Sequence, residues 1–389
     1  MSRSRRNTVR LVVAGGGTGG HTYPALTTVQ AVRDVLNERG IALDAAWFGT
    51  SSGLESRIAK ENSIPFRPLA AGKVRRSLRP GALARTALDM LKVPLGIAQA
   101  IASLARSRPD VVLSTGGYVA VPVGLAARLT GRKLVMHEQI MTLGLANRVL
   151  ARFATTIAVS HATSLDSLSA RVRRRAVVTG NPIRPALLGG NRAAAHTHYQ
   201  LDPFLPLVYV TGGAQGSAQI NRLVTQILPD LLEHCQILHQ CGPDNLGPLQ
   251  AATTSLPAAL AERYHLVPYV SGNLADVYAA ADVVVSRSGA GTLAELTALA
   301  RPSVLIPLVP TAGHEQQRGA EALQDAGAAL AMVGDQASAE RLREVLLPLL
   351  KDSSRLADMS QAAQRLGAPD AARQLADLII DHTWAGHHR

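Results

Sequence analysis

His21 is the residue whose position in this chain is best suited to proton transfer. It follows the glycine-rich sequence Gly15–Gly20 and stands at the start of a predicted helix. A helix N-terminus disfavours the imidazolium ion, so an imidazole placed there stays neutral and able to accept a proton. We therefore predict that His21 is a general base, with a capping or packing role as the alternative.

A second turn is suited to holding a diphosphate. A predicted strand ends at Ser286, and the chain continues through Ser288–Gly291 into a helix that opens near Thr292. The first N–H groups of a helix bind anions, so this turn is predicted to hold a pyrophosphate. Glu295 lies one turn inside the helix, where it can accept hydrogen bonds from a ribose diol or complement the helix dipole.

Arg184 closes the sequence Gly180–Arg184 after a predicted strand and can contact a phosphate, with a structural salt bridge as the alternative. The histidines form no HExxH pattern, and the spacing of Cys235 and Cys241 fits neither a zinc pair nor a redox pair. We therefore predict no metal site, no bound cofactor and two reduced, buried thiols.

Short apolar runs alternate with helical stretches along the chain, which predicts a parallel α/β fold. The predicted strands are Val9–Ala14, Ala45–Phe48, Val111–Leu113, Leu134–Met136, Thr156–Val159, Ala176–Val178, Leu207–Val210, Gln236–Leu238, His265–Val267, Val283–Val285 and Val304–Ile306. The predicted helices include Pro24–Arg39, Gln219–Leu232, Thr292–Ala300 and Gln316–Asp325, with a final helix from Pro369 to about Asp381.

One glycine-rich turn opens each half of the chain, Gly15–Gly20 in the first and Gly212–Ser217 in the second. This duplication predicts two Rossmann-like parallel-sheet domains that face each other across a cleft. We place them at residues 1–187 and 207–367, followed by a C-terminal helix and tail at 368–389. Glycines and prolines break the pattern at 188–206, which is the predicted linker.

The composition indicates a globular protein with an anionic partner. Hydrophobic residues make up 47% of the chain, and the net charge is +12 at pH 7. Aromatic residues are only 3%, which argues against a nucleic-acid binder built on stacking.

Residues 73–108 hold eight lysines and arginines, one acid and many interleaved aliphatic residues. This pattern predicts contact with an anionic membrane surface, with a solvated basic face around a packed helix as the alternative. No stretch of 18 apolar residues occurs, and the first apolar run is too short for a signal peptide. We therefore expect a peripheral protein on the cytoplasmic face of the cell membrane.

Seven segments in the same order resemble the MurG family of peptidoglycan N-acetylglucosaminyltransferases, in the GT-B group. They are Gly15–Leu26, Ser114–Pro122, His137-Glu138-Gln139, Gly180–Arg184, Gly212–Asn221, Ser286–Glu295 and Gln316-Gln317. The resemblance implies transfer of N-acetylglucosamine from UDP-N-acetylglucosamine, with inversion and without a bound metal. The acceptor it implies is the muramoyl sugar of undecaprenyl-pyrophosphoryl-MurNAc-pentapeptide (lipid I), a polyprenyl-pyrophosphate-linked sugar.

The resemblance also assigns roles to residues of this chain. His21 is the catalytic base, Val270 reads uracil through its backbone, and Gln316 and Gln317 read the sugar hydroxyls. The implied donor-binding residues are Thr18, Gly19, Gly20, Arg184, Ala214, Val270, Arg287, Ser288, Gly289, Ala290, Gly291, Thr292, Leu293, Glu295, Gln316 and Gln317. The implied acceptor-side residues are Gly116, Gly117, Tyr118, His137, Glu138 and Ile140.

Two positions depart from the family pattern. Ile140 stands where the family usually has asparagine, and Ala214 where it usually has serine. Each change removes a polar contact, so a MurG-like enzyme with another polyprenyl-linked or antibiotic-type acceptor is an alternative. A UDP-N-acetylglucosamine 2-epimerase of the same fold and a non-catalytic sugar-nucleotide sensor are the further alternatives.

Overall fold

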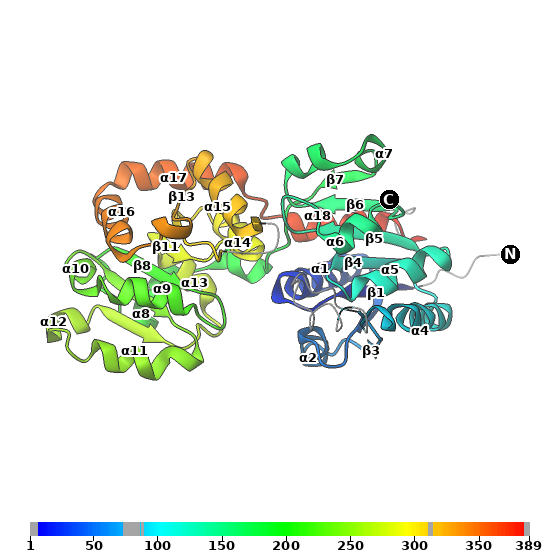
Figure 1. The fold of residues 1–389 in the computed structure, drawn as a ribbon, viewed down its shortest axis with the longest axis horizontal. Coiled ribbons are helices and arrows are strands. Elements are labelled where there is room, and N and C mark those ends of the chain that lie inside the picture. Colours follow the sequence, from blue (N-terminus) through cyan, green and yellow to red (C-terminus); the bar gives the residue numbers. More distant parts are fainter. Residues whose placement is uncertain (1–6, 73–85, 87–88, 310–313, 385–389) are drawn as a thin grey trace. The chain divides into compact units, whose positions relative to one another are not determined.

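The chain forms two compact units in the computed structural model, shown in Figure 1. The first comprises residues 1–183 and 370–389, and the second comprises residues 184–369. Within them the structure describes residues 7–72, 86, 89–309 and 314–384. Part of the basic segment 73–108 expected at a membrane, residues 73–85 and 87–88, lies outside the described residues.

The described part of the first unit is built on a seven-stranded parallel sheet in the order β3-β2-β1-β4-β5-β6-β7. The strands are β1 (Thr8–Gly15), β2 (Ala42–Gly49), β3 (Phe66–Pro68), β4 (Val111–Gly116), β5 (Lys133–Glu138), β6 (Thr156–Val159) and β7 (Ala176–Val178). The central strands are buried on both faces, which explains why they read as continuous apolar runs.

Helices cover both faces of this sheet. They are α1 (Gly19–Glu38), α2 (Leu54–Glu61), α4 (Lys92–Ser107), α5 (Ala120–Leu129), α6 (Leu145–Leu150), α7 (Ala170–Arg173) and α18 (Ala371–Asp381), with a 3₁₀ turn η1 at Ala162–Ser167. Val9, Leu11 and Val13 of β1 pack on the side of α1 and α18, while Val12 and Ala14 pack on the side of α4 and α5. This alternation divides the unit into two apolar layers.

The last helix, α18, completes the core of the first unit. Leu375, Ile379 and Ile380 are buried among residues of α1 such as Val32. Two ion pairs join the same helices, Arg373 to Glu38 at 2.8 Å and Arg39 to Asp377 at 3.3 Å. The chain therefore returns to its first unit after finishing the second.

The described part of the second unit contains a six-stranded parallel sheet in the order β10-β9-β8-β11-β12-β13. The strands are β8 (Leu207–Thr211), β9 (Gln236–Gln240), β10 (Tyr264–Val267), β11 (Val283–Ser286), β12 (Ser303–Leu305) and β13 (Ala329–Ala331). The helices are α8 (Arg192–Tyr199), α9 (Ala218–Thr225), α10 (Leu228–Leu232), α11 (Leu246–Thr253), α12 (Ala258–Ala261), α13 (Leu274–Ala280), α14 (Ala290–Ala298), α15 (Glu315–Asp325), α16 (Ala339–Lys351) and α17 (Ser353–Leu366). Short 3₁₀ turns are η2 (Pro185–Gly189), η3 (Pro243–Asn245) and η5 (Gly334–Gln336).

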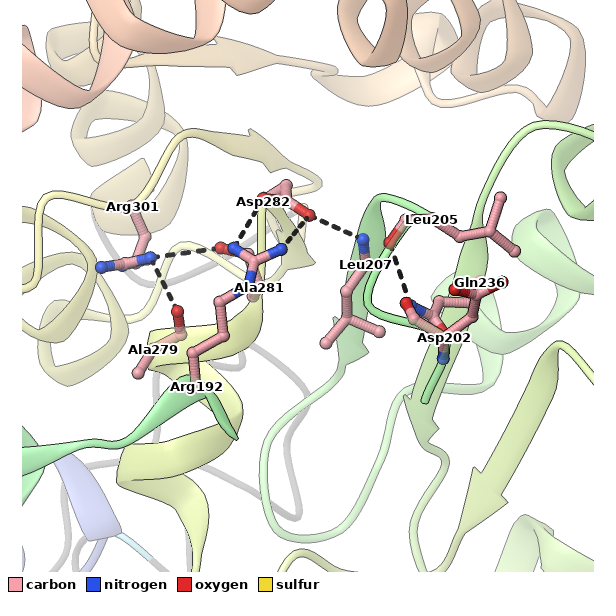
Figure 2. A network of polar contacts seen from close by, with 9 residues as sticks. All are labelled: Arg192, Asp202, Leu205, Leu207, Gln236, Ala279, Ala281, Asp282 and Arg301. Carbon is pink, nitrogen blue, oxygen red and sulfur yellow. Dashed lines mark hydrogen bonds and ion pairs between the residues drawn. The ribbon is translucent and has the colours of Figure 1, made fainter. Parts of the chain in front are cut away.

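The segment 188–206, where the sequence predicts a linker, is folded into the second unit. It contains helix α8, capped by the side chain of Asn191, which accepts hydrogen bonds from two backbone amides. Arg192 pairs with Asp282 at 3.1 Å, and the same carboxylate accepts from the amide of Leu207 at 2.8 Å (Figure 2). The division between units falls instead between Ile183 and Arg184.

Partly buried polar contacts hold the amino-terminal edge of this second sheet together (Figure 2). Gln236 exchanges hydrogen bonds with the backbone of Asp202 and also donates to the carbonyl of Leu205 at 3.0 Å. The guanidinium of Arg301 donates to the carbonyls of Ala279 and Ala281. These bonds fix the entry to β8 and β11 at the edge opposite to the glycine-rich turns.

Among the described residues, no helix combines the length and the apolar character needed to cross a membrane.

Candidate active site

The glycine-rich turn after β1 packs backbone against backbone on the turn after β4. A Cβ at Gly117 would lie 2.3 Å from the carbonyl oxygen of Gly16, and one at Gly15 would lie 1.8 Å from Thr115 Oγ1. Gly117 also has φ +82°, a conformation that side chains disfavour. The glycines are therefore needed for the close approach of the two turns.

Glu55, at the start of α2, holds this turn from the other side. Its buried carboxylate accepts from the amide of Gly17 at 3.1 Å and from the amide and hydroxyl of Thr50 at 3.1 and 2.7 Å. The sequence motifs did not reveal this residue, because nothing in the spacing of an acid at 55 links it to glycines at 15–17.

His21 lies in the first turn of α1 and is half-buried. Its Nδ1 lies 2.9 Å from the carbonyl oxygen of Thr115 and 3.0 Å from Gln139 Oε1. Both partners accept hydrogen bonds, so Nδ1 carries the proton and Nε2 carries the lone pair. The ring is therefore held with its basic nitrogen turned away from its protein contacts, as a general base requires.

Gly116 and Gly117 flank this imidazole. A Cβ at Gly116 would lie 3.3 Å from His21 Cε1, and one at Gly117 would lie 3.4 Å from His21 Cδ2. Tyr118 lies beside them, since a Cβ at Gly17 would come within 2.8 Å of its ring. Of the predicted acceptor-side residues, Gly116 and Gly117 thus lie against His21, and Tyr118 lies against Gly17.

Thr18, Gly19 and Gly20 form the start of α1. Thr18 is the N-cap residue, but no side chain of the described residues caps the helix there. The first-turn amides of α1 therefore offer positive partial charge beside His21.

His137 and Glu138, at the end of β5, are buried and bonded to protein groups. His137 Nε2 lies 3.0 Å from the carbonyl oxygen of Gly180, and burial lowers the pKa of His137 to about 4, so the ring is neutral. Burial raises the pKa of the Glu138 carboxyl. Glu138 accepts from the amides of Gly144 and Ile140 at 2.8 and 3.3 Å and from Asn147 Nδ2 at 3.0 Å. The side chains of His137 and Glu138 are therefore bonded within the protein. Ile140, which follows two residues later, is half-buried.

In the second unit, the turn after β11 opens α14 without a side-chain cap from the described residues. Gly289 is the N-cap residue, and a Cβ there or at Gly291 would meet open space. Thr292 is half-buried, whereas Leu293 is 5% exposed and packs into the core. Ala290, Gly291 and Thr292 therefore present backbone at the positive end of a nine-residue helix.

Glu295, one turn into α14, is the centre of a polar group. Its carboxylate accepts from the hydroxyl of Tyr278 at 2.9 Å and pairs with Arg184 at 3.6 Å. Burial raises the pKa of the Glu295 carboxyl, while Arg184 opposes the shift. Burial also raises the pKa of Tyr278, so this phenol stays protonated and donates. Arg184, predicted to contact phosphate, lies in the same unit as the donor-site turn and pairs with its acid.

Four other predicted donor residues are bonded to neighbouring protein groups. Arg287 donates to Gln219 Oε1 at 2.8 Å and to the carbonyl of Ile306 at 2.9 Å. Ser288 is buried and donates to the carbonyl of Gln316 at 2.7 Å, which ties the α14 turn to the start of α15. The Gln316 side chain accepts from the amide of Leu308 at 3.0 Å, and Gln317 donates to Glu321 at 2.8 Å.

The second glycine-rich turn is fastened by Gln240, which the sequence motifs missed. Gln240 donates to Thr211 Oγ1 and to the carbonyl of Gly213 at 3.1 and 2.9 Å. It also accepts from the amide of Val270 at 2.9 Å, so the backbone of Val270 offers its carbonyl rather than its N–H. Ala214 is exposed at the tip of this turn.

Among the described residues, no group of three or more histidine, cysteine, aspartate or glutamate side chains is placed to hold a metal ion.

Comparison with known proteins matches both units. The glycosyltransferase family 28 N-terminal domain matches residues 11–159, and the C-terminal domain of the same family matches residues 207–375. A relative from Desulforudis audaxviator is 35% identical over 376 residues, which are 95% of this chain and 98% of that protein. It is named UDP-N-acetylglucosamine–N-acetylmuramyl-(pentapeptide) pyrophosphoryl-undecaprenol N-acetylglucosamine transferase.

Two further comparisons agree. A protein of the same name from Halorhodospira halophila is 39% identical over 369 residues, with 95% of this chain and 97% of that protein covered. The crystal structure of MurG from Acinetobacter baumannii superposes with a TM-score of 0.72 at 26% identity, over 95% of this chain and 99% of that one. The chain therefore belongs to glycosyltransferase family 28 and, within it, to the MurG family of N-acetylglucosamine transferases.

Proposed function

We propose that this protein transfers N-acetylglucosamine from UDP-N-acetylglucosamine to the muramoyl sugar of undecaprenyl-pyrophosphoryl-MurNAc-pentapeptide. Family membership over nearly the whole chain supports the donor and the acceptor class. The observation that carries the chemistry is the hydrogen bonding of His21, whose Nδ1 is held by two acceptors. This leaves Nε2 as the atom that takes the proton of the acceptor hydroxyl.

The donor occupies the second unit in this proposal. Its diphosphate lies at the N-terminus of α14, where helix amides and their dipole meet negative charge. Glu295 accepts from the ribose hydroxyls, and Val270 offers its backbone carbonyl to the uracil. Arg184 already lies beside Glu295, so its guanidinium is available for a phosphate oxygen without a long movement.

The reaction is a single displacement. The acceptor hydroxyl oxygen forms a bond to the anomeric carbon of the sugar while the bond from that carbon to the diphosphate oxygen breaks. The hydroxyl proton moves to His21 Nε2, and the electron pair leaves with UDP. Attack from the side opposite to UDP inverts the configuration. Positive potential at the leaving oxygen comes from α14, which stabilises charge that develops only in the transition state.

A lipid-linked acceptor requires access to a membrane surface, and we propose that the first unit provides it. Within the basic segment 73–108, Leu91 and Leu95 at the start of α4 are 74% and 55% exposed. Lys92 lies between them with its side chain 57% exposed. Exposed leucines beside basic residues favour a peripheral position on an anionic leaflet.

The test is incubation of the purified protein with UDP-N-acetylglucosamine and the lipid-linked muramoyl-pentapeptide, with mass spectrometry of the lipid fraction. We expect a disaccharide lipid and stoichiometric UDP. Folded protein that forms no such product would refute the proposed acceptor. Release of N-acetylmannosamine from the donor alone would instead indicate an epimerase.

A different acceptor within the same enzyme class is favoured by Ile140. This apolar residue, whose backbone amide donates to the buried Glu138 at 3.3 Å, stands where the family usually has an asparagine. An acceptor panel with labelled donor separates the two possibilities, because use of the muramoyl lipid alone would exclude the second.

A further inference from the structure

A chain of hydrogen bonds runs from the backbone of Gly180 to the imidazole of His21. His137 Nε2 bonds the carbonyl of Gly180 at 3.0 Å, and Gln139 Nε2 lies 3.0 Å from His137 Nδ1. Gln139 Oε1 lies 3.0 Å from His21 Nδ1. Gln139 is therefore the only link, among the described residues, that touches both histidine rings.

Each end of this chain is fixed by a carbonyl that can only accept. The carbonyl of Gly180 requires a proton on His137 Nε2, which leaves His137 Nδ1 as an acceptor. The carbonyl of Thr115 requires a proton on His21 Nδ1. Gln139 must then donate to His137 and accept from His21, and this is the orientation that its amide has. Both backbone anchors demand the same arrangement.

Burial keeps these hydrogen-bonded groups in the protonation state just described. His137 is fully buried, and the pKa of its ring is lowered to about 4 by desolvation, so it stays neutral at physiological pH. Gln139 is 2% exposed, so its amide lies away from bulk water. A neutral His137 offers one acceptor nitrogen toward Gln139, and the amide N–H of Gln139 satisfies it.

We propose that Gln139 is a positioning residue that, with His137 behind it, fixes His21 in the Nδ1–H tautomer and so makes Nε2 the proton-accepting atom. This inference rests on the proposed role of His21 as the base. In this proposal the buried end of β5 acts on the reaction through His21, without touching the substrate.

Ionisable side chains near the turns that surround His21 include Tyr23, Glu55, Tyr118, His137, Glu138, the exposed Arg148, and His161. Both carboxylates are bonded elsewhere: Glu55 accepts from Gly17 and Thr50, and Glu138 accepts from Ile140, Gly144 and Asn147. A charge placed at position 139 would therefore act on His21 more directly than any existing carboxylate.

Two variants separate the tautomer from the charge. In Gln139→Leu the amide link is lost, and the Nε2–H tautomer of His21 gains population. We expect kcat to fall about ten- to hundredfold, with the KM for donor unchanged. In Gln139→Glu a carboxylate faces His21 Nδ1–H, so the tautomer is kept while the imidazolium is favoured. The acidic limb of the kcat/KM profile should move up by about 1 pH unit.

Gln236→Leu is a matched control. Gln236 is equally buried and makes three hydrogen bonds with backbone groups, but it lies in the second unit. This variant should lose stability in a comparable way and leave both the His21 signals and the acidic limb unchanged.

The tautomer is read from the two nitrogen resonances of His21 in ¹⁵N-histidine-labelled full-length protein, assigned by their absence in His21→Ala. Wild-type signals in Gln139→Leu, together with an unshifted acidic limb in Gln139→Glu, would overturn the proposal. If His21→Ala keeps its turnover while Gln139→Leu changes the tautomer, the base role fails and the positioning role stands. If His21→Ala loses its turnover while Gln139→Leu leaves the signals unchanged, the base role stands and the positioning role fails.

Discussion

Thr115 and His21 bind each other reciprocally across two elements of the first unit. The carbonyl of Thr115 accepts from His21 Nδ1 at 2.9 Å, and the hydroxyl of Thr115 donates to the carbonyl of His21 at 2.8 Å. The side chain of each residue is thus bonded to the backbone carbonyl of the other. The orientation of the imidazole is consequently set by β4 as firmly as by its own helix.

Replacing His21 by alanine should lower kcat strongly and leave donor affinity unchanged. The base contributes about 10²- to 10⁴-fold to proton transfer, whereas the residues proposed to hold the diphosphate, ribose and uracil lie in the second unit. Rapid-quench turnover at saturating substrates, with calorimetric titration of UDP, measures both quantities. A large loss of UDP affinity at unchanged saturating turnover would contradict the assignment of His21 as base.

Replacing Glu295 by glutamine should weaken UDP binding about tenfold or more. The change removes the charged acceptor proposed for the ribose and breaks the ion pair with Arg184. Asp230→Asn is the matched control, because Asp230 pairs with Arg343 at 3.0 Å on the surface of the same unit. Equal UDP affinities for the two variants in calorimetry would exclude the ribose role.

Replacing Gly117 by alanine should lower the free energy of unfolding by about 2–4 kcal/mol. The new methyl group would overlap the carbonyl of Gly16, and the alanine would have to keep the left-handed backbone conformation of Gly117. Gly40→Ala isolates the conformational part, since Gly40 has φ +69° with open space around it, and should cost about 1 kcal/mol. Urea unfolding distinguishes them; equal losses would mean that the two turns separate without strain.

Stability should fall on acidification from about pH 6.5 toward pH 4, in part because of His239. Burial lowers the pKa of this ring to about 3. Between pH 6.5 and 4 the imidazole is therefore protonated in the unfolded chain and stays neutral in the folded chain. Stability is therefore greatest above the unfolded pKa and declines as pH falls, by up to about 1.4 kcal/mol per pH unit per such group. His137 adds to the same slope, whereas Glu138 and Glu295, whose pKa values are raised, oppose it at lower pH.

The variant His239→Gln tests this linkage. Its free energy of unfolding, measured by denaturant titration at several pH values, should vary less steeply than that of the wild type between pH 6.5 and 4. A parallel pH dependence in the two proteins would show that His239 is protonated in the folded state or never titrates on unfolding.

Much of the fold follows from local pattern. The strands Thr156–Val159 and Ala176–Val178 lie where the apolar runs predict them. The first is buried, as a continuously apolar strand of a parallel sheet should be, whereas the second is an edge strand whose two valines are exposed. The predicted helix Gln219–Leu232 is divided into α9 and α10, with Pro229 in the first turn of the latter. The strands β3 and β13 are not among the predicted strands; β3 contains Arg67 and Pro68 and therefore forms no apolar run.

The long-range parts could not be predicted in this way. Glycines and prolines at 188–206 indicate interruptions, but they do not tell whether the interrupted segment packs onto a domain, as α8 does. In the site, a motif identifies His21 and Glu295, whose neighbours along the chain carry the signal. Glu55, Gln139 and Gln240 act on residues 27 to 118 positions away, through contacts that spacing does not encode.

Because α18 packs on the first unit, the two units are completed in a fixed order during synthesis of the chain. Residues 184–369 are contiguous, so the second unit has all its residues outside the ribosome before the first has its last helix. Until Leu375 and Ile379 emerge, the apolar side of α1 that they cover stays exposed to water. The nascent chain therefore contains every residue of the second unit before the unit that carries His21 can close its core.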